Sequence, residues 1–202
     1  MTNIVFDIGN VLITWDEHAA FRGTFPDDAT IDQFFAEVGF YEWNLEQDRG
    51  RSRSEAVAAV SAKWPEYAPF LDQFFDRFPE TIQKKISGSW KILGDLKTSG
   101  LRVFGLTNWG AETWPMAEEV HPELKNAFED VVVSGQEKLT KPDRRIYEVL
   151  TDRNNLRPDE CLFIDDSPKN VEGARIAGWQ ALHFIGSDGL RSSLEDLKLL
   201  RS

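Results

Sequence analysis

The sequence predicts an α/β fold, in which a doubly wound parallel sheet carries a helical cap near one edge. Five short apolar runs typical of strands lie at residues 4–6, 101–106, 131–133, 162–164 and 181–185. From residue 87 onward, the strand patterns alternate with helical patterns. Such alternation around continuous apolar runs is typical of a parallel sheet with helices on both faces, as in a Rossmann-like fold.

Three helices are expected around the later strands, and two of them have a start or stop signal. The pattern of residues 92–96 predicts a helix that ends before Gly100, and a second helix is expected over residues 146–150. A third begins with Ser167 as N-cap and Pro168 in the first helical position. Small side chains let this third helix lie close to the sheet, at positions Gly173, Ala174 and Ala177.

The segment 15–85 interrupts this alternation with aromatic-rich helical patterns. Within it, Ser52 and Glu55 fit a capping box at the start of a helix. Because the segment lies between the first strand and the rest of the sheet, we interpret it as an inserted helical cap. The predicted core is therefore formed by residues 1–14 and 86–202. The alternative is that the aromatic helices belong to one continuous core.

Composition limits the class of protein and its partners. The formal net charge of −11 argues against nucleic acid as a partner, although a small anion can still bind local cations. Cys161 is the only cysteine, which indicates a reducing compartment and no disulfide framework. The chain has no signal-peptide pattern and no apolar run of about 18 residues. We expect a soluble, cytoplasmic protein without membrane partners, and the sequence gives no signal for its oligomeric state.

Several polar residues follow the expected strands or begin helices. They are Asp7, Thr107, Asn108, Lys141, Asp165 and Asp166. In a doubly wound sheet, ligands bind outside the carboxyl ends of the strands, so we expect these side chains to share one site. Three carboxylates in a small space repel one another, and a divalent cation relieves that repulsion. Oxygen-only ligands of this kind suit Mg²⁺, which leaves a position for a substrate phosphate.

This set of residues predicts phosphoryl transfer. Asp7 would bind the cation through one carboxylate oxygen and attack phosphorus through the other. Lys141 would orient Asp7 and neutralise the phosphoryl group, while the hydroxyl of Thr107 would donate to the phosphoryl oxygens. Each residue alone also fits a turn or a helix cap. Their joint occurrence at strand ends favours the site.

Four segments resemble the motifs of the haloacid dehalogenase superfamily, whose members are mostly phosphatases. They are residues 6–12 (FDIGNVL), 106–108 (LTN), 141–147 (KPDRRIY) and 163–174 (FIDDSPKNVEGA). The first motif, together with the cap segment 48–50 (DRG), is similar to the branch of bacterial sugar-phosphate phosphatases of the glucose-1-phosphatase type.

The resemblance implies a role for each site residue. Asp7 would form an aspartyl-phosphate, Thr107 and Asn108 would bind the phosphoryl group, and Lys141 would neutralise it. The implied magnesium ligands are Asp7, the backbone carbonyl of Gly9, and Asp166, with Asp165 supporting the ion through water. The implied substrate is a small phosphorylated metabolite such as a sugar phosphate.

Gly9 departs from the family pattern. Most phosphatases of the superfamily have a second Asp at this position as general acid and base, and glycine cannot transfer a proton. Since general acid–base catalysis contributes roughly 10²–10⁴-fold, we expect slow turnover or a preference for good leaving groups unless another group substitutes. Asp16, at the cap entrance, is one candidate for that group.

Two other functions stay open from the sequence. A metal-independent 2-haloacid dehalogenase would use Asp7 to attack carbon and a cap arginine to hold the substrate carboxylate. The arginines available are Arg22, Arg49, Arg51 and Arg53. The pair Asp165 and Asp166 does not resemble the Ser-Asn pattern of such dehalogenases, and unpaired carboxylates beside Asp7 are costly without a cation. The remaining alternative is a catalytically weak phosphate-binding domain, which Gly9 would explain.

Overall fold

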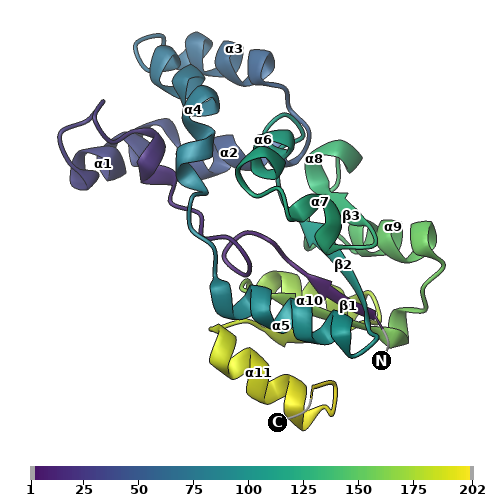
Figure 1. Ribbon diagram of the computed structural model, residues 1–202. Helices are drawn as coiled ribbons and strands as arrows, with labels where there is room; N and C mark the ends of the chain where they lie inside the picture. The colour runs from purple at the N-terminus through teal and green to yellow at the C-terminus, as the bar shows by residue number, and fades with distance from the viewer. Residues whose placement is uncertain (1–2, 201–202) are drawn as a thin grey trace.

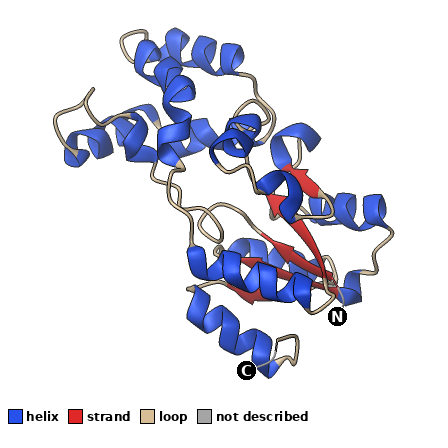
Figure 2. Ribbon diagram, viewed as in Figure 1, coloured by secondary structure: helices blue, strands red, loops and turns tan. Residues whose placement is uncertain are grey.

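A five-stranded parallel sheet forms the centre of the computed structural model, which describes residues 3–200 (Figures 1 and 2). The strand order is β3-β2-β1-β4-β5, and every neighbouring pair is parallel. The strands are β1 (Asn3–Phe6), β2 (Arg102–Thr107), β3 (Val131–Val133), β4 (Cys161–Asp165) and β5 (Gln180–His183). The predicted fold class is confirmed. The bounds of β3 equal those of the predicted run, and the other strand bounds differ by at most two residues.

Helices cover both faces of the sheet. They are α5 (Ser87–Thr98) and α11 (Ser187–Asp196) on one face, and α9 (Arg144–Asn154) and α10 (Pro168–Ile176) on the other. Alternation along β1 explains the two layers, because Ile4 and Phe6 pack with the first pair of helices and Val5 packs with the second. Burial on both faces accounts for the continuous apolar runs in the sequence.

The three expected helices are present as α5, α9 and α10. Gly100 follows α5 with a φ of 82°, a left-handed conformation that suits glycine. Pro168 is the first residue of α10, as predicted. Ser167 is the N-cap of α10 by position, but its side chain makes no capping hydrogen bond.

Four α-helices and one 3₁₀-helix lie between β1 and α5, gathered beyond one end of the sheet (Figure 1). They are η1 (Glu17–Ala20), α1 (Asp28–Val38), α2 (Phe40–Asp48), α3 (Arg53–Lys63) and α4 (Ala68–Thr81). The predicted capping box is present: the Ser52 N–H donates to Glu55 Oε2 at 2.9 Å, and the Glu55 N–H donates to Ser52 Oγ at 3.3 Å. One hydrophobic cluster runs from β1 into these helices, and the cap boundary at residues 15–85 stays a prediction.

Short elements complete the fold. They are α6 (Trp114–Val120), α7 (Leu124–Ala127), α8 (Ser134–Glu137) and η2 (Pro158–Glu160). Within residues 3–200, none of the helices combines the length and the apolar character needed to span a bilayer.

Gly173 and Gly94 provide a matched test of helix packing. A Cβ at Gly173 would lie 2.7 Å from Pro142 Cβ and 2.9 Å from the Tyr147 hydroxyl, whereas a Cβ at Gly94 would meet nothing within 4 Å. We expect Gly173→Ala to lower the free energy of unfolding by about 1–3 kcal/mol through overpacking. Gly94→Ala should raise it by about 0.5–1 kcal/mol, because alanine favours the helix. Urea unfolding measures both, and equal stability of the two variants would contradict this packing.

Candidate active site

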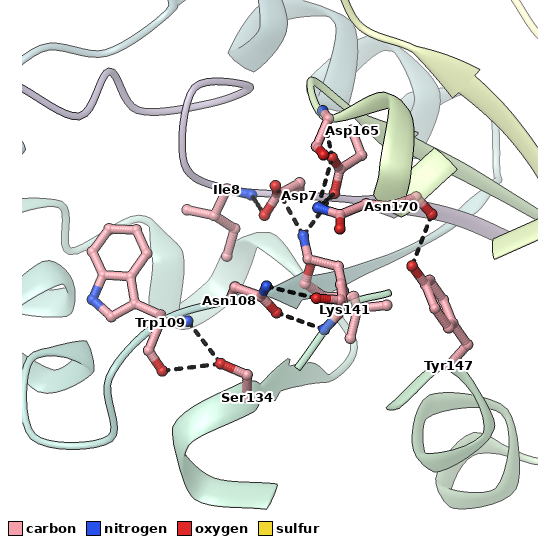
Figure 3. A network of polar contacts seen from close by, with 11 residues as sticks. Asp7, Ile8, Asn108, Trp109, Ser134, Lys141, Tyr147, Asp165 and Asn170 are labelled. Carbon is pink, nitrogen blue, oxygen red and sulfur yellow. Dashed lines mark hydrogen bonds and ion pairs between the residues drawn. The ribbon is translucent and has the colours of Figure 1, made fainter. Parts of the chain in front are cut away.

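Lys141 lies between two carboxylates at the carboxyl edge of the sheet (Figure 3). Its ammonium nitrogen is 2.9 Å from Asp7 Oδ2 and 2.7 Å from Asp165 Oδ2. It also donates to the Leu106 carbonyl at 3.1 Å. The three N–H groups of the ammonium therefore have three acceptors, and this fixes the side chain between β1, β2 and β4.

Asn108, just after β2, positions the backbone of Lys141. Its Oδ1 accepts from the Lys141 N–H at 2.8 Å, and its Nδ2 donates to the Lys141 carbonyl at 3.1 Å (Figure 3). Both polar atoms of the Asn108 amide are thus engaged with Lys141. The structure places Asn108 beside the other predicted residues, but its side-chain amide is directed toward the backbone of Lys141.

Asp7 extends directly from β1 into the site. Its N–H donates to the Ile164 carbonyl at 2.9 Å, which continues the pairing with β4 beyond the last strand residue. Its Oδ1 accepts from the Ile8 N–H at 2.7 Å. The residue is only 7% exposed, so its carboxylate has a fixed orientation and a small opening to solvent.

The two consecutive acidic residues after β4 have different surroundings. Asp165 is fully buried and accepts from the Ser167 N–H at 2.7 Å and from Asn170 Nδ2 at 3.1 Å, in addition to Lys141. Asp166 is half-buried and lines a cavity. Sequence reasoning did not assign Asn170 to the site, although it lies within the fourth motif.

Carboxylate oxygens of Asp7, Asp165 and Asp166 lie within 4.8 Å of one another. Burial raises the pKa of Asp7, with Asp165 and Asp166 adding repulsion that Lys141 only partly offsets. Burial also raises the pKa of Asp165, but Lys141 and hydrogen bonds outweigh it and hold that pKa below its usual range. Three carboxylates and one ammonium leave two negative charges, which one divalent cation neutralises. This donor set fits a hard cation such as Mg²⁺.

A cavity of about 160 Å³ opens beside these carboxylates. Residues from β-strand ends line it together with residues from α2 and α4, which belong to the helices between β1 and α5 (η1 and α1–α4) that we call the inserted helices. The lining consists of Asp7, Gly9, Asn10, Trp15, Asn44, Gln47, Asp48, Phe74, Phe75, Phe78, Asn108, Trp109, Gly110, Thr113 and Asp166. This lining contains no arginine or lysine. The cavity therefore combines a polar, acidic floor with an aromatic wall.

The arginines considered as carboxylate ligands make other contacts. Arg22 pairs with Asp16 at 2.7 Å and with Asp28 at 2.8 Å. The remaining three bind groups of the inserted helices: Arg49 pairs with Glu46, Arg51 donates to the Trp43 carbonyl, and Arg53 pairs with Asp72 and Asp76.

Asp16 is held by Arg22 and does not line the cavity, so the structure does not bring this candidate acid to the site.

Polar residues from α2 reach the cavity, which sequence reasoning missed. Asn44, Gln47 and Asp48 line it. The only sequence signal for them is the resemblance of residues 48–50 to a family cap segment, because the position of α2 over the sheet depends on tertiary packing.

The parallel sheet carries clustered carboxylates and a lysine at its carboxyl edge, where ligands bind in doubly wound α/β folds. Residues 1–178 match the haloacid dehalogenase-like hydrolases. The chain belongs to this family, as the sequence motifs indicated.

Known proteins similar to the chain include phosphatases. The phosphoserine phosphatase of Thermus thermophilus is 32% identical, over 76% of this chain and 72% of the relative. The D-ribitol-5-phosphate phosphatase of Bacteroides thetaiotaomicron is 24% identical, over 88% of this chain and 89% of the relative. An (S)-2-haloacid dehalogenase from Pseudomonas is also similar, at 28% identity over 46% of this chain and 40% of that enzyme.

Other relatives are much longer than this chain. The chain spans 13% of mouse acyl-CoA dehydrogenase family member 10 and 36% of a drimenol cyclase from Aspergillus calidoustus. A solved structure of a haloacid dehalogenase family enzyme from Bacteroides thetaiotaomicron shares the fold, with a TM-score of 0.73 at 21% identity over 91% of this chain and 93% of that one. The wild-type form of the same enzyme has been solved in complex with magnesium and inorganic phosphate, with a TM-score of 0.69 at 20% identity and the same coverage.

Thr107 ends β2 with a buried hydroxyl that has no hydrogen-bond partner within residues 3–200. Thr81, equally buried, donates its hydroxyl to the Phe78 carbonyl at 2.7 Å. We therefore expect Thr107→Val to leave the free energy of unfolding unchanged or higher, while Thr81→Val lowers it by about 0.5–1.5 kcal/mol. Thermal and urea unfolding test this contrast, and a loss at Thr107 as large as at Thr81 would show that the Thr107 hydroxyl is bonded in the folded protein.

Proposed function

We propose that the protein is a Mg²⁺-dependent phosphomonoester hydrolase that acts through an aspartyl-phosphate at Asp7 on a small phosphate ester. The observation that carries the proposal is the bridge from Lys141 to Asp7 and Asp165 at 2.9 and 2.7 Å. It orients one buried carboxylate at the cavity floor and leaves the cluster with the charge that a divalent cation balances. The similarity to two phosphatases supports the same activity.

Each residue of the site would have its own role in the reaction. Asp7, Asp166 and the Gly9 carbonyl would hold Mg²⁺, which supplies charge neutralisation for the phosphoryl group. Asp7 would attack phosphorus through its other oxygen. Lys141 would hold Asp7 in place and add positive charge. Its bonds to Asp165 and Leu106 keep it there.

The hydroxyl of Thr107, which has no hydrogen-bond partner among residues 3–200, would donate to a phosphoryl oxygen. Because the Asn108 amide is engaged with Lys141, its contact with the phosphoryl group would come from the backbone N–H. Donors fixed around the transferred group provide much of the catalysis of phosphoryl transfer, because charge spreads over its oxygens in the transition state.

A 2-haloacid dehalogenase is less well supported. That reaction needs a cation for the substrate carboxylate, and the cavity lining contains no arginine or lysine. The acidic pair Asp165 and Asp166 would also leave excess negative charge without a metal. Both observations favour phosphate over a halogenated acid.

The first prediction for this activity concerns Mg²⁺ and Asp7. Phosphate release from a panel of phosphomonoesters should require Mg²⁺, stop with a chelator and return when Mg²⁺ is added. Asp7→Asn should abolish it, because the amide is a poor nucleophile and a weaker metal ligand. A malachite-green assay measures release, with thermal unfolding as the control for folding. Release that persists in the variant would contradict the role of Asp7.

The second prediction concerns substrate charge. Beyond the phosphoryl group, the substrate would face Asp48, Asn44 and aromatic side chains, with no cation from the lining. Burying a substrate carboxylate in a cavity without a cation to pair with it costs several kcal/mol. We therefore expect kcat/KM for glycerol phosphate to exceed that for phosphoglycerate by at least about tenfold. A preference for phosphoglycerate would rule out this assignment of the cavity.

A further inference from the structure

We propose that Asp48, on the inserted helix α2, is the general acid and base of the reaction and replaces the proton-transfer group that Gly9 lacks. The inference rests on the proposed phosphatase activity and adds a catalytic residue to it. Asp48 lines the same cavity as Asp7, Gly9 and Asp166. A leaving group in that cavity would therefore lie between the nucleophile and this second carboxylate.

Close backbone contacts fix the end of α2 over the sheet edge. Gly50 has a φ of 96°, and a Cβ there would lie 2.8 Å from the Gly135 carbonyl oxygen, so this turn packs directly on α8. Gln47 contacts Gly110, in the loop after β2. The Gln47 side chain is itself held by Arg51 at 2.7 Å. These contacts on both sides of Asp48 determine where its carboxylate enters the cavity.

The Asp48 carboxylate has no structural partner among residues 3–200. It forms neither an ion pair nor a side-chain hydrogen bond there, in contrast to Asp165 and Asp16. It is also the last residue of α2, where the helix dipole disfavours negative charge. A half-buried carboxylate at such a position destabilises the folded protein. A role in proton transfer accounts for its presence there.

The surroundings of Asp48 suit a group that changes its protonation near neutral pH. Burial raises the pKa of Asp48 to about 7, although Lys141 and Arg49 lower it. Asp7 and Asp166 are the other acidic residues that line the cavity, and Lys138 lies against the Gly50 turn. A general acid and base works best when its pKa is near the operating pH.

The proposed proton transfers balance over two steps. As Asp7 bonds to phosphorus and the ester P–O bond breaks, protonated Asp48 gives its proton to the leaving oxygen and an alcohol departs. Water then attacks phosphorus, the bond to Asp7 breaks, and the Asp48 carboxylate takes the water proton. Inorganic phosphate leaves, Asp7 is again a carboxylate and Asp48 is again protonated.

Asp48→Asn tests the assignment with two substrates. Glycerol phosphate has a poor leaving group and should lose about 10²–10⁴-fold in kcat. With p-nitrophenyl phosphate, whose leaving group needs no proton, the variant should release one p-nitrophenolate per enzyme in a burst and then turn over slowly, because hydrolysis of the aspartyl-phosphate lacks its base. Asp16→Asn is the matched control, since that carboxylate is held by Arg22 outside the cavity, and it should behave as the natural protein does.

A rescue variant separates proton transfer from a structural role. A Cβ at Gly9 would meet nothing within 4 Å, so Gly9→Asp in the Asp48→Asn background should fit and should raise kcat for glycerol phosphate at least tenfold over the single variant. The Asp48→Asn protein should also melt no lower than the natural one, since it loses an unpaired charge.

Several results would overturn the assignment of Asp48. They are turnover within twofold of the natural protein on both substrates, an equal loss on both substrates without a burst, or a variant that unfolds. If the natural protein itself hydrolysed neither ester with Mg²⁺, the proposed phosphatase activity would fail first. That outcome differs from a failure of the Asp48 assignment alone, because the burst experiment would then give no signal with any variant.

Discussion

The organisation of the site depends on the ion pairs of one buried lysine. Lys141 joins Asp7 after β1 to Asp165 at the end of β4, and it also binds the carbonyl of Leu106 in β2. Breaking a buried pair by removing one partner typically costs about 3–5 kcal/mol, so these contacts couple stability to the geometry of the site. The same contacts hold the carboxylate of Asp7 at the floor of the cavity.

The inserted helices complete a site that the sheet begins. The sheet edge provides the carboxylates, the lysine and the Thr107 hydroxyl, which is without a partner in the described part of the chain. Helices α2 and α4 provide the polar and aromatic wall of the cavity. Contact between the two parts is close because glycines stand on both sides: Gly50 lies against α8, and Gly110 lies against Gln47. The fold therefore determines which groups meet a leaving group as well as which groups meet phosphate.

Most of the fold could be predicted from the sequence because burial on both faces leaves a local signature. The strands appear as apolar runs, and the predicted N-cap with Pro168 marks the start of α10. The residues after the strands could be grouped into one site because parallel strands bring their carboxyl ends together. Each of these signals is contained in a short segment of the sequence.

Other features of the site depend on contacts between distant segments. The four cap arginines looked available for a substrate carboxylate, but the structure gives each of them another partner. Asp16 was a candidate acid by proximity in sequence, and Arg22 binds it outside the cavity. Asp48 was not assigned a role, because nothing in its local pattern shows that α2 ends over the sheet edge.

The most direct test of the central claim is to look for phosphate on Asp7 during turnover. Reaction with a phosphomonoester and Mg²⁺ is stopped with acid at successive times, and the peptide that contains Asp7 is examined by mass spectrometry. We predict a phosphoryl group on Asp7 that forms and disappears at rates that match product release. Turnover without phosphate on Asp7, or with phosphate on another residue, would contradict it.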